Sequence, residues 1–201
     1  MQSTETTDSR FLEPLTAMVL GLAAVLTAVA AYLSSVQGGN EDEARADAIK
    51  YTAEANAATN AAIQTRAADQ AMFASWSESS YSDNDDFAEY LMTLMRPEPK
   101  VAIEALGTSE NDAPTPFELD DYVIADEQSA TETFADADTA EKKAKVAADR
   151  GDAYDKSAIF LALALFFAGI ATTFRRRLFA TGLLAVGTVT LVIGAVQLAG
   201  A

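Results

Sequence analysis

Long uncharged apolar runs alternate with polar segments along the chain, and this pattern predicts its architecture. Three windows are apolar enough for helices in a membrane, at residues 11–35, 153–174 and 178–200. A helix that crosses about 30 Å of hydrocarbon needs roughly 20 such residues. The pattern therefore predicts an all-α membrane protein with three transmembrane helices, one near the N-terminus and two forming a C-terminal hairpin.

The polar remainder of the chain divides into a short tail and one long segment. Residues 1–10 show no apolar pattern, so we expect a disordered tail there. Residues 36–152 are expected to form an acidic helical segment outside the membrane. Gly38–Gly39 should end the first apolar helix, because Gly has a low helix propensity.

Alanines recur at helical spacing in two parts of the long segment. One stripe runs from Ala53 to Met72 and the other from Phe134 to Gly151. Helices with such stripes, each continuous with a span, favour an antiparallel helical hairpin. An Ala stripe buries little apolar area, so the first helix should need a close partner, either a returning helix or another subunit.

Small residues also share faces within the apolar helices, which predicts close helix packing in lipid. The predicted packing residues are Ala17, Gly21, Ala24, Ala28, Ala158, Ala162, Gly169, Gly187 and Gly194. In the first apolar helix, this face is expected to contact the other two spans or a second copy of the chain.

Three arginines between the last two spans predict the orientation in the membrane. Lys and Arg in short loops stay on the cytoplasmic side, so Arg175, Arg176 and Arg177 should form a cytoplasmic loop at residues 175–177. The N-terminus would then be cytoplasmic, while residues 36–152 and the C-terminus would be extracytoplasmic. The expected location is the cell membrane.

Charge is concentrated in the segment between the first and second spans. Residues 37–156 hold 27 Asp and Glu against 10 Lys and Arg, while the whole chain has a formal net charge of -16. A mean hydropathy of only +0.06 reflects the averaging of apolar spans with this polar segment. So acidic a surface excludes a nucleic-acid partner on that side.

Candidate chemistry is sparse in this sequence. The chain has no Cys and no His, which removes the commonest metal ligands and general base. Ser82–Asp86 lacks the Gly and Glu of a calcium loop, and Asp86 with Glu89 instead predicts that Asp86 is the N-cap of a helix. Asp120 and Asp121 favour a solvated turn over carboxylate catalysis. We therefore expect no enzyme, cofactor, metal site or small-molecule substrate.

An aromatic cluster lies near the far end of the first Ala-rich helix. Phe73, Trp76 and Tyr81 are spaced so that their rings can approach one another on that helix. The preferred interpretation is a packing cluster, and the alternative is a ligand cage.

Short motifs at both ends of the chain resemble a known family. Leu33-Ser34-Ser35 with Gly38–Gly39 follows the first span, Gly151-Asp152-Ala153-Tyr154-Asp155 enters the second, and Arg175–Arg177 leads to Leu178 and Gly182. The chain resembles an uncharacterised family of three-span bacterial and archaeal membrane proteins defined by a domain of unknown function. The resemblance implies the architecture and no activity, and residues 82–126 do not contribute to it.

Two functional hypotheses follow from these patterns. The preferred one is a structural or interaction module that is anchored in the bilayer and self-associates or docks another membrane protein. The alternative is an oligomeric channel or ion-conducting subunit whose acidic vestibule concentrates cations. The apolar helices hold no Asp, Glu, Lys, Arg or His deep within them, which argues against pumps and coupled transporters.

Overall fold

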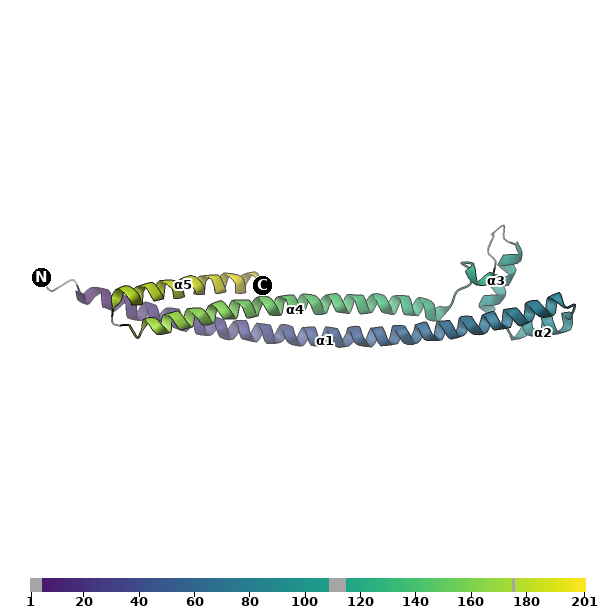
Figure 1. Cartoon of the computed structure of the whole chain (residues 1–201), viewed down its shortest axis with the longest axis horizontal. Helices are drawn as coiled ribbons and strands as arrows, with labels where there is room; N and C mark the ends of the chain where they lie inside the picture. Colours follow the sequence, from purple (N-terminus) through teal and green to yellow (C-terminus); the bar gives the residue numbers. More distant parts are fainter. Residues whose placement is uncertain (1–4, 109–114, 175) are drawn as a thin grey trace. The chain divides into compact units, whose positions relative to one another are not determined.

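The computed structural model describes residues 5–108, 115–174 and 176–201, with the backbone alone for residues 5–13. Within these ranges the chain is helical and contains no strand, which confirms the all-α prediction. Figure 1 shows the order of the elements. They are α1 (Glu5–Tyr81), α2 (Asp85–Leu94), α3 (Pro97–Thr108), the 3-10 helix η1 (Pro116–Glu118), α4 (Ala125–Ala171) and α5 (Arg177–Gly200).

Helix α1 differs from the prediction at two places. It begins at Glu5, so residues 5–10 of the predicted disordered tail are helical, and residues 1–4 lie outside the described residues. It also passes through Gly38–Gly39, where the sequence predicted a break. Two glycines cost only about 2 kcal/mol of helix propensity together, and neither has a positive φ. Packing against α4 offsets that cost, since a Cβ on Gly151 would lie 3.7 Å from the Cβ of the neighbouring Gln37.

A tight turn separates α1 from α2. Asp83 has a φ of 54°, and the N–H groups of Ser82 and Asn84 both donate to the Ser79 carbonyl oxygen. Helix α2 begins at Asp85, so Asp86 lies within its first turn and is not the predicted N-cap. Acidic side chains there still favour the helix through its dipole.

The second apolar window continues from a long polar helix, as the sequence predicted. Helix α4 runs from Ala125 to Ala171 and includes the polar residues that precede the window. A two-residue turn at Thr172 and Thr173 ends it, with the Thr173 N–H donating to the Ile170 carbonyl oxygen at 2.9 Å. Helix α5 follows after Arg176.

The chain divides into two compact units, and α1 and α4 contribute to both. Unit 1 comprises residues 1–46 and 140–201, and unit 2 comprises residues 47–139. Unit 1 therefore holds all three apolar windows, and unit 2 holds 20 of the 30 Asp and Glu residues.

Unit 1 is built from the first part of α1, the second part of α4, and α5, which lie side by side in Figure 1. Its buried residues come from all three helices and are mainly small. They are Val19, Ala23, Ala30, Leu161, Ala164, Ala168, Ala171, Leu184 and Leu191.

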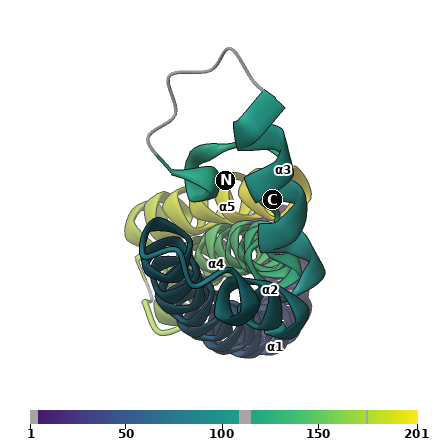
Figure 2. The ribbon, with the colours of Figure 1, turned by 90° about the vertical axis from the view of Figure 1, so that its right-hand side faces the viewer.

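Unit 2 combines the end of α1, the start of α4 and the elements between them. In Figures 1 and 2, α2 lies alongside the end of α1. Its core is aromatic and aliphatic, and α3 contributes to it together with η1. The buried residues of this core are Ala62, Ala102, Phe117, Tyr122 and Ile124, with Phe73 packed against them.

Candidate functional site

A close helix contact in unit 1 joins α5 to α4 at two glycines. A Cβ on Gly194 would lie 2.8 Å from Leu161 Cγ and 3.2 Å from the Leu161 backbone nitrogen. A Cβ on Gly187 would lie 3.2 Å from the Ala164 carbonyl oxygen and 3.2 Å from the Ala168 backbone nitrogen. Both positions were predicted to pack, and the missing side chains let the two backbones approach closely.

The other predicted packing residues of α4 lie in mixed environments. Ala158 is partly buried against the core of unit 1, whereas Ala162 is exposed. Gly169 is partly buried, but a Cβ there would meet no atom within 4 Å. The contact with α5 therefore runs along Leu161, Ala164 and Ala168, which lie on a neighbouring face of α4.

The small-residue face predicted for α1 does not pack against any part of the chain that the structure describes. Its members are all exposed, and they are Ala17, Gly21, Ala24 and Ala28. The packed face instead carries Val19, Ala23 and Ala30. Val19 follows Ala17 by two residues, so this face lies about 200° around the helix from the predicted one. Val19 fills space that a Gly or Ala would leave empty, which explains the choice of face. Contact of the exposed face with a second copy stays a prediction.

The predicted basic loop lies between α4 and α5. Arg176 and Arg177 are exposed, and Arg177 is the first residue of α5. Arg175 lies outside the described residues. The structure contains no membrane, so the cytoplasmic location of this loop stays a prediction.

A buried carboxylate organises the polar contacts of unit 2. Asp69 on α1 is only 5% exposed, and its Oδ2 accepts two hydrogen bonds of 2.9 Å. One comes from Arg96 Nη1 at the α2–α3 junction and the other from the Tyr122 hydroxyl before α4. Arg96 Nη2 also lies 3.1 Å from Glu98 Oε1. The network therefore ties three segments that are distant in sequence.

Tyr122 is held in its neutral form by this environment. Burial raises the pKa of its hydroxyl above the ordinary value of 10.0, and the hydrogen bond to Asp69 raises it further. The Arg66 guanidinium lies over the same ring, with its carbon 5.4 Å from the ring centroid. A phenol in this state donates a hydrogen bond and does not act as a base near neutral pH.

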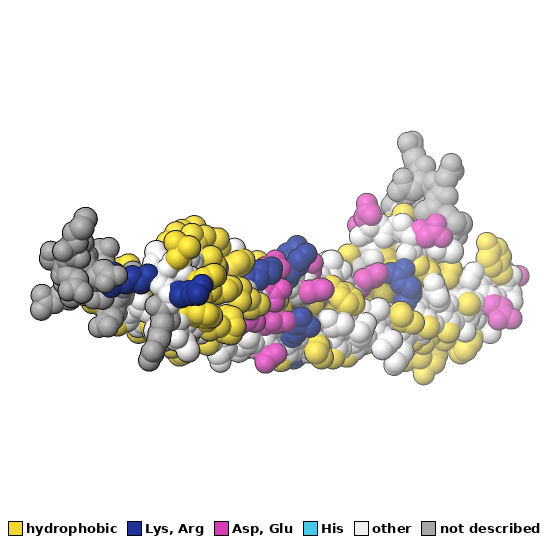
Figure 3. Space-filling model, turned by 60° about the vertical axis from the view of Figure 1, so that its left-hand side comes forward, with side chains coloured by type: hydrophobic (Ala, Val, Ile, Leu, Met, Phe, Trp, Pro, Cys, Tyr) yellow, Lys and Arg dark blue, Asp and Glu magenta, His cyan; other side chains and the backbone are white. Residues whose placement is uncertain are grey.

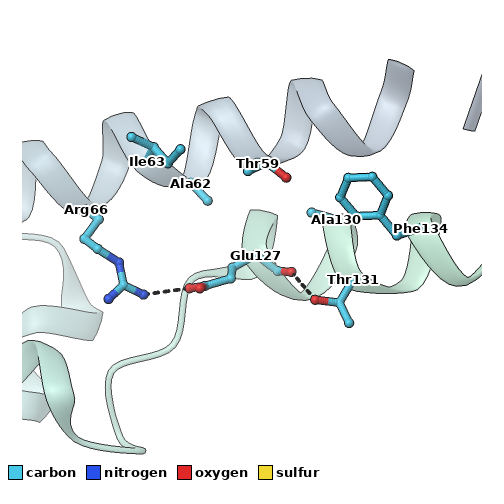
Figure 4. A pocket seen from close by; sticks show the side chains of 8 residues that line it. All are labelled: Thr59, Ala62, Ile63, Arg66, Glu127, Ala130, Thr131 and Phe134. Atoms are coloured by element: carbon cyan, nitrogen blue, oxygen red, sulfur yellow. Dashed lines mark hydrogen bonds and ion pairs between the residues drawn. The ribbon is translucent and has the colours of Figure 1, made fainter. Parts of the chain in front are cut away.

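A groove lies between α1 and α4 beside this network, as Figure 4 shows. Ala62 and Ala130 are buried within it, while Ile63 and Phe134 are exposed along it. Arg66 Nη2 donates to Glu127 Oε2 at 2.8 Å, at the end of the groove away from Phe134 (Figure 4). This ion pair is partly exposed on both sides, so it stabilises the helix contact only weakly.

The aromatic cluster is a packing cluster with a different membership from the predicted one. Phe73 lies 5.7 Å from Trp76 and 5.5 Å from Phe117, measured between ring centroids. Phe117 in turn meets Tyr122 edge-to-face at 5.0 Å. Tyr81 is 89% exposed, and it lines one surface pocket together with Phe73 and Trp76. Ile103 and Leu106 of α3 also line this pocket. Its use as a ligand cage stays the untested alternative.

Acidic side chains of the described residues do not gather into a metal site. No set of three His, Cys, Asp or Glu side chains lies close enough there to hold a metal ion. Asp120 and Asp121 are both exposed, in the turn before α4. Asp69 is buried beneath its partners, so it orients segments of unit 2 and presents no reactive oxygen at the surface.

Sequence reasoning did not find the Asp69 network. A signal was nevertheless present, because Asp69 follows Ala55 and Ala62 at intervals of seven residues on the buried face of α1. A carboxylate in a series of buried alanines requires partners. The cationic partner of Asp69 could have been limited to four candidate residues, because residues 47–139 contain only four Lys and Arg.

The fold defines a helical protein with three helices that are long and apolar enough to cross a membrane. Residues 104–200 match the model of a family described as Domain of unknown function (DUF4337). Over this range, which includes the motifs at Gly151–Asp155 and Arg175–Arg177, the resemblance to an uncharacterised family is confirmed. The match also covers part of residues 82–126, and the motifs at Leu33–Gly39 lie outside it.

Searches of the curated proteins and of the solved structures found no match.

Proposed function

We propose that this protein is an integral membrane protein whose unit 1 crosses the bilayer three times and whose unit 2 is an acidic interaction module. The proposed role is non-enzymatic. The expected partners are the lipid bilayer and either a second copy of the chain or another membrane protein. The proposal includes neither a nucleic acid nor a small-molecule substrate.

The supporting observation is the inverted packing of unit 1. Residues inside are mostly small, such as Ala23, Ala164 and Gly187. Large apolar side chains lie outside on all three helices, including Leu22, Leu163 and Val189. Figure 3 shows hydrophobic side chains gathered on the surface of this unit. In water such a surface would aggregate, whereas in lipid it is solvated and small residues allow close helix contact.

The same packing favours an anchor over a pore within one chain. Leu161 is fully buried, and α5 approaches α4 closely at Gly187 and Gly194. A conducting path would therefore require several copies. The channel alternative predicts cation flux into liposomes that carry the purified chain, and the anchor predicts none.

Membrane integration can be tested by extraction. Membranes that contain the full chain are washed at alkaline pH, which removes peripheral proteins but not spanning ones. The chain should stay in the pellet and dissolve only with detergent. Release into the wash would contradict the proposal.

The orientation can be tested by labelling single cysteines, because the natural chain has none. Ser129→Cys lies on an exposed position of α4 in unit 2, and Thr173→Cys lies in the exposed turn before α5. On intact spheroplasts, a membrane-impermeant maleimide should label the first variant and spare the second. The reverse pattern would invert the proposed topology, with unit 2 inside the cell.

A further inference from the structure

Helix α1 carries a second heptad face in unit 2 that no other part of the described chain covers. Ile49, Asn56, Ile63 and Gln70 recur every seven residues, and all four are exposed. Ala53, Asn60, Ala67 and Ala74 follow each of them by four residues and are exposed as well. This alternation of four and three is the spacing of a coiled-coil seam. We call these eight residues the open seam.

The open seam is distinct from the face that α1 uses within the chain. The buried series Ala55, Ala62 and Asp69 precedes it by one residue at each repeat, which corresponds to about 100° around the helix. The Figure 4 groove lies between the two faces, since Ile63 belongs to both the groove and the open seam. Ile49 is 73% exposed and Ile63 is 60% exposed, so most of the apolar surface of both side chains is open to a partner.

We propose that the open seam pairs with the same seam of a second copy, as a parallel two-stranded coiled coil. The proposal rests on the membrane-anchored role proposed above, because two chains inserted in one membrane with the same orientation meet in parallel. A two-fold axis places each residue of the open seam against its own counterpart.

The polar residues of the open seam favour a second copy over an unrelated protein. Asn56 occupies the same heptad position as Ile49 and Ile63. An amide carries both donors and acceptors, so Asn56 of one chain can hydrogen-bond to Asn56 of the other. The residues that follow each interval of four, Ala53, Asn60, Ala67 and Ala74, occupy the a positions of the heptad, and Asn60 is the one polar residue among them. A single Asn at an a position is known to set the register and the two-stranded state of parallel coiled coils.

Charge gives an independent argument. Unit 2 holds 20 Asp and Glu against four Lys and Arg, so two copies repel each other over most of its surface. Residues 55–77 of α1 contain only two charged residues, Arg66 and Asp69, and the partners of both lie within the chain. Two copies can therefore approach along this stretch without adding unpaired like charges.

The area of such a seam is modest, because six of its eight residues are Ala, Asn or Gln. Burial at about 25 cal/mol per Å² would give weak association between free chains. Anchoring in a membrane raises the effective concentration of the two seams, which allows a weak contact to persist. We therefore expect the pairing to be strongest in membranes and weaker in dilute detergent.

Adjacent alanines provide a matched test in native membranes. Ala67→Cys lies in the open seam, and Ala68→Cys lies about 100° away on the same helix, with both positions exposed. A short bis-maleimide should join Ala67→Cys chains into a species of twice the mass and should join Ala68→Cys chains severalfold less. Equal yields, no crosslink at Ala67→Cys, or a crosslink to a protein of different mass would overturn the proposal.

A charge substitution supplies a second readout. Asn56→Asp changes the amide to a carboxylate of nearly the same shape and places two negative charges face to face. It should abolish the crosslink at Ala67→Cys, whereas Gln128→Glu, on an exposed position of α4, should leave it unchanged. An undiminished crosslink in Asn56→Asp contradicts the seam. Recovery of each variant in the membrane fraction separates failure of the pairing from failure of the membrane proposal.

Discussion

Units 1 and 2 are both helical, yet opposite kinds of residue stabilise them. The interior of unit 1 consists mainly of Ala, Gly and a few Leu, and most of its large apolar side chains face outward. The interior of unit 2 holds aromatic rings and a buried Asp–Arg–Tyr network, and its surface is acidic. This difference is what the proposed membrane location of unit 1 predicts, since apolar side chains gain little by leaving lipid but gain much by leaving water.

The largest expected effect is in unit 2, at its buried carboxylate. Asp69→Ala leaves Arg96 and Tyr122 without their common acceptor and should lower the free energy of unfolding by about 3 kcal/mol. Trp76 is the only Trp and lies in unit 2, so its fluorescence follows this unit during denaturation. Asp120→Ala, at an exposed carboxylate, is the control and should change little. A loss below about 1 kcal/mol would mean that the network does not hold unit 2 together.

The corresponding test in unit 1 adds side-chain volume at a close helix contact. Gly194→Leu places a side chain where Leu161 already lies, and overpacking of this kind costs about 2 kcal/mol. The matched control is Gly182→Leu on the same helix, where a Cβ meets no atom within 4 Å. Thermal unfolding in detergent, followed by circular dichroism, should show a lower transition temperature for the first variant alone. Similar transitions in both would contradict the close contact of α5 with α4.

The raised pKa of Tyr122 predicts a pH dependence that is specific to unit 2. In the unfolded chain the hydroxyl loses its proton near its ordinary value of 10.0, while in the folded chain it keeps the proton to higher pH. Its contribution to stability is therefore fully present below about pH 10 and is lost as the pH rises above that value. Tyr122→Phe should remove this dependence and cost about 1 kcal/mol near neutral pH. Denaturant titrations followed by Trp76 fluorescence at several pH values measure both effects. A wild-type curve with the same alkaline slope as Tyr122→Phe would be inconsistent with the buried hydrogen bond.

The smallest effect is expected at the exposed ion pair of the groove. Glu127→Gln removes the charge that faces Arg66 but keeps a hydrogen-bond acceptor of the same size. The loss in unfolding free energy should lie between zero and about 1 kcal/mol and should shrink as salt is added. Together with Asp69→Ala it tests whether burial, and not the number of ion pairs, sets the stability of unit 2. A loss as large as that of Asp69→Ala would reverse this interpretation.

Some local features could be read from the sequence because they depend on neighbouring residues. The three apolar helices, the helix that continues into the second window, and the small residues at Gly187 and Gly194 all follow from composition and spacing. The predicted helix break at Gly38–Gly39 was wrong, because helix propensity contributes little to helix stability and is outweighed by packing. Which face of α1 packs inside unit 1 could not be read from the sequence, since Val19 with Ala23 and the stripe at Ala17 have the same helical spacing.

The sequence by itself determined the helical class, the three apolar windows and the concentration of negative charge between them. These properties follow from the order and type of residues, and no distant contact is needed to establish them. Only the tertiary structure decided that Asp69 meets Arg96 and Tyr122, and that one face of α1 is covered while its neighbour stays open. Such choices depend on which distant segments pack together, and a helical repeat alone leaves several faces equally possible.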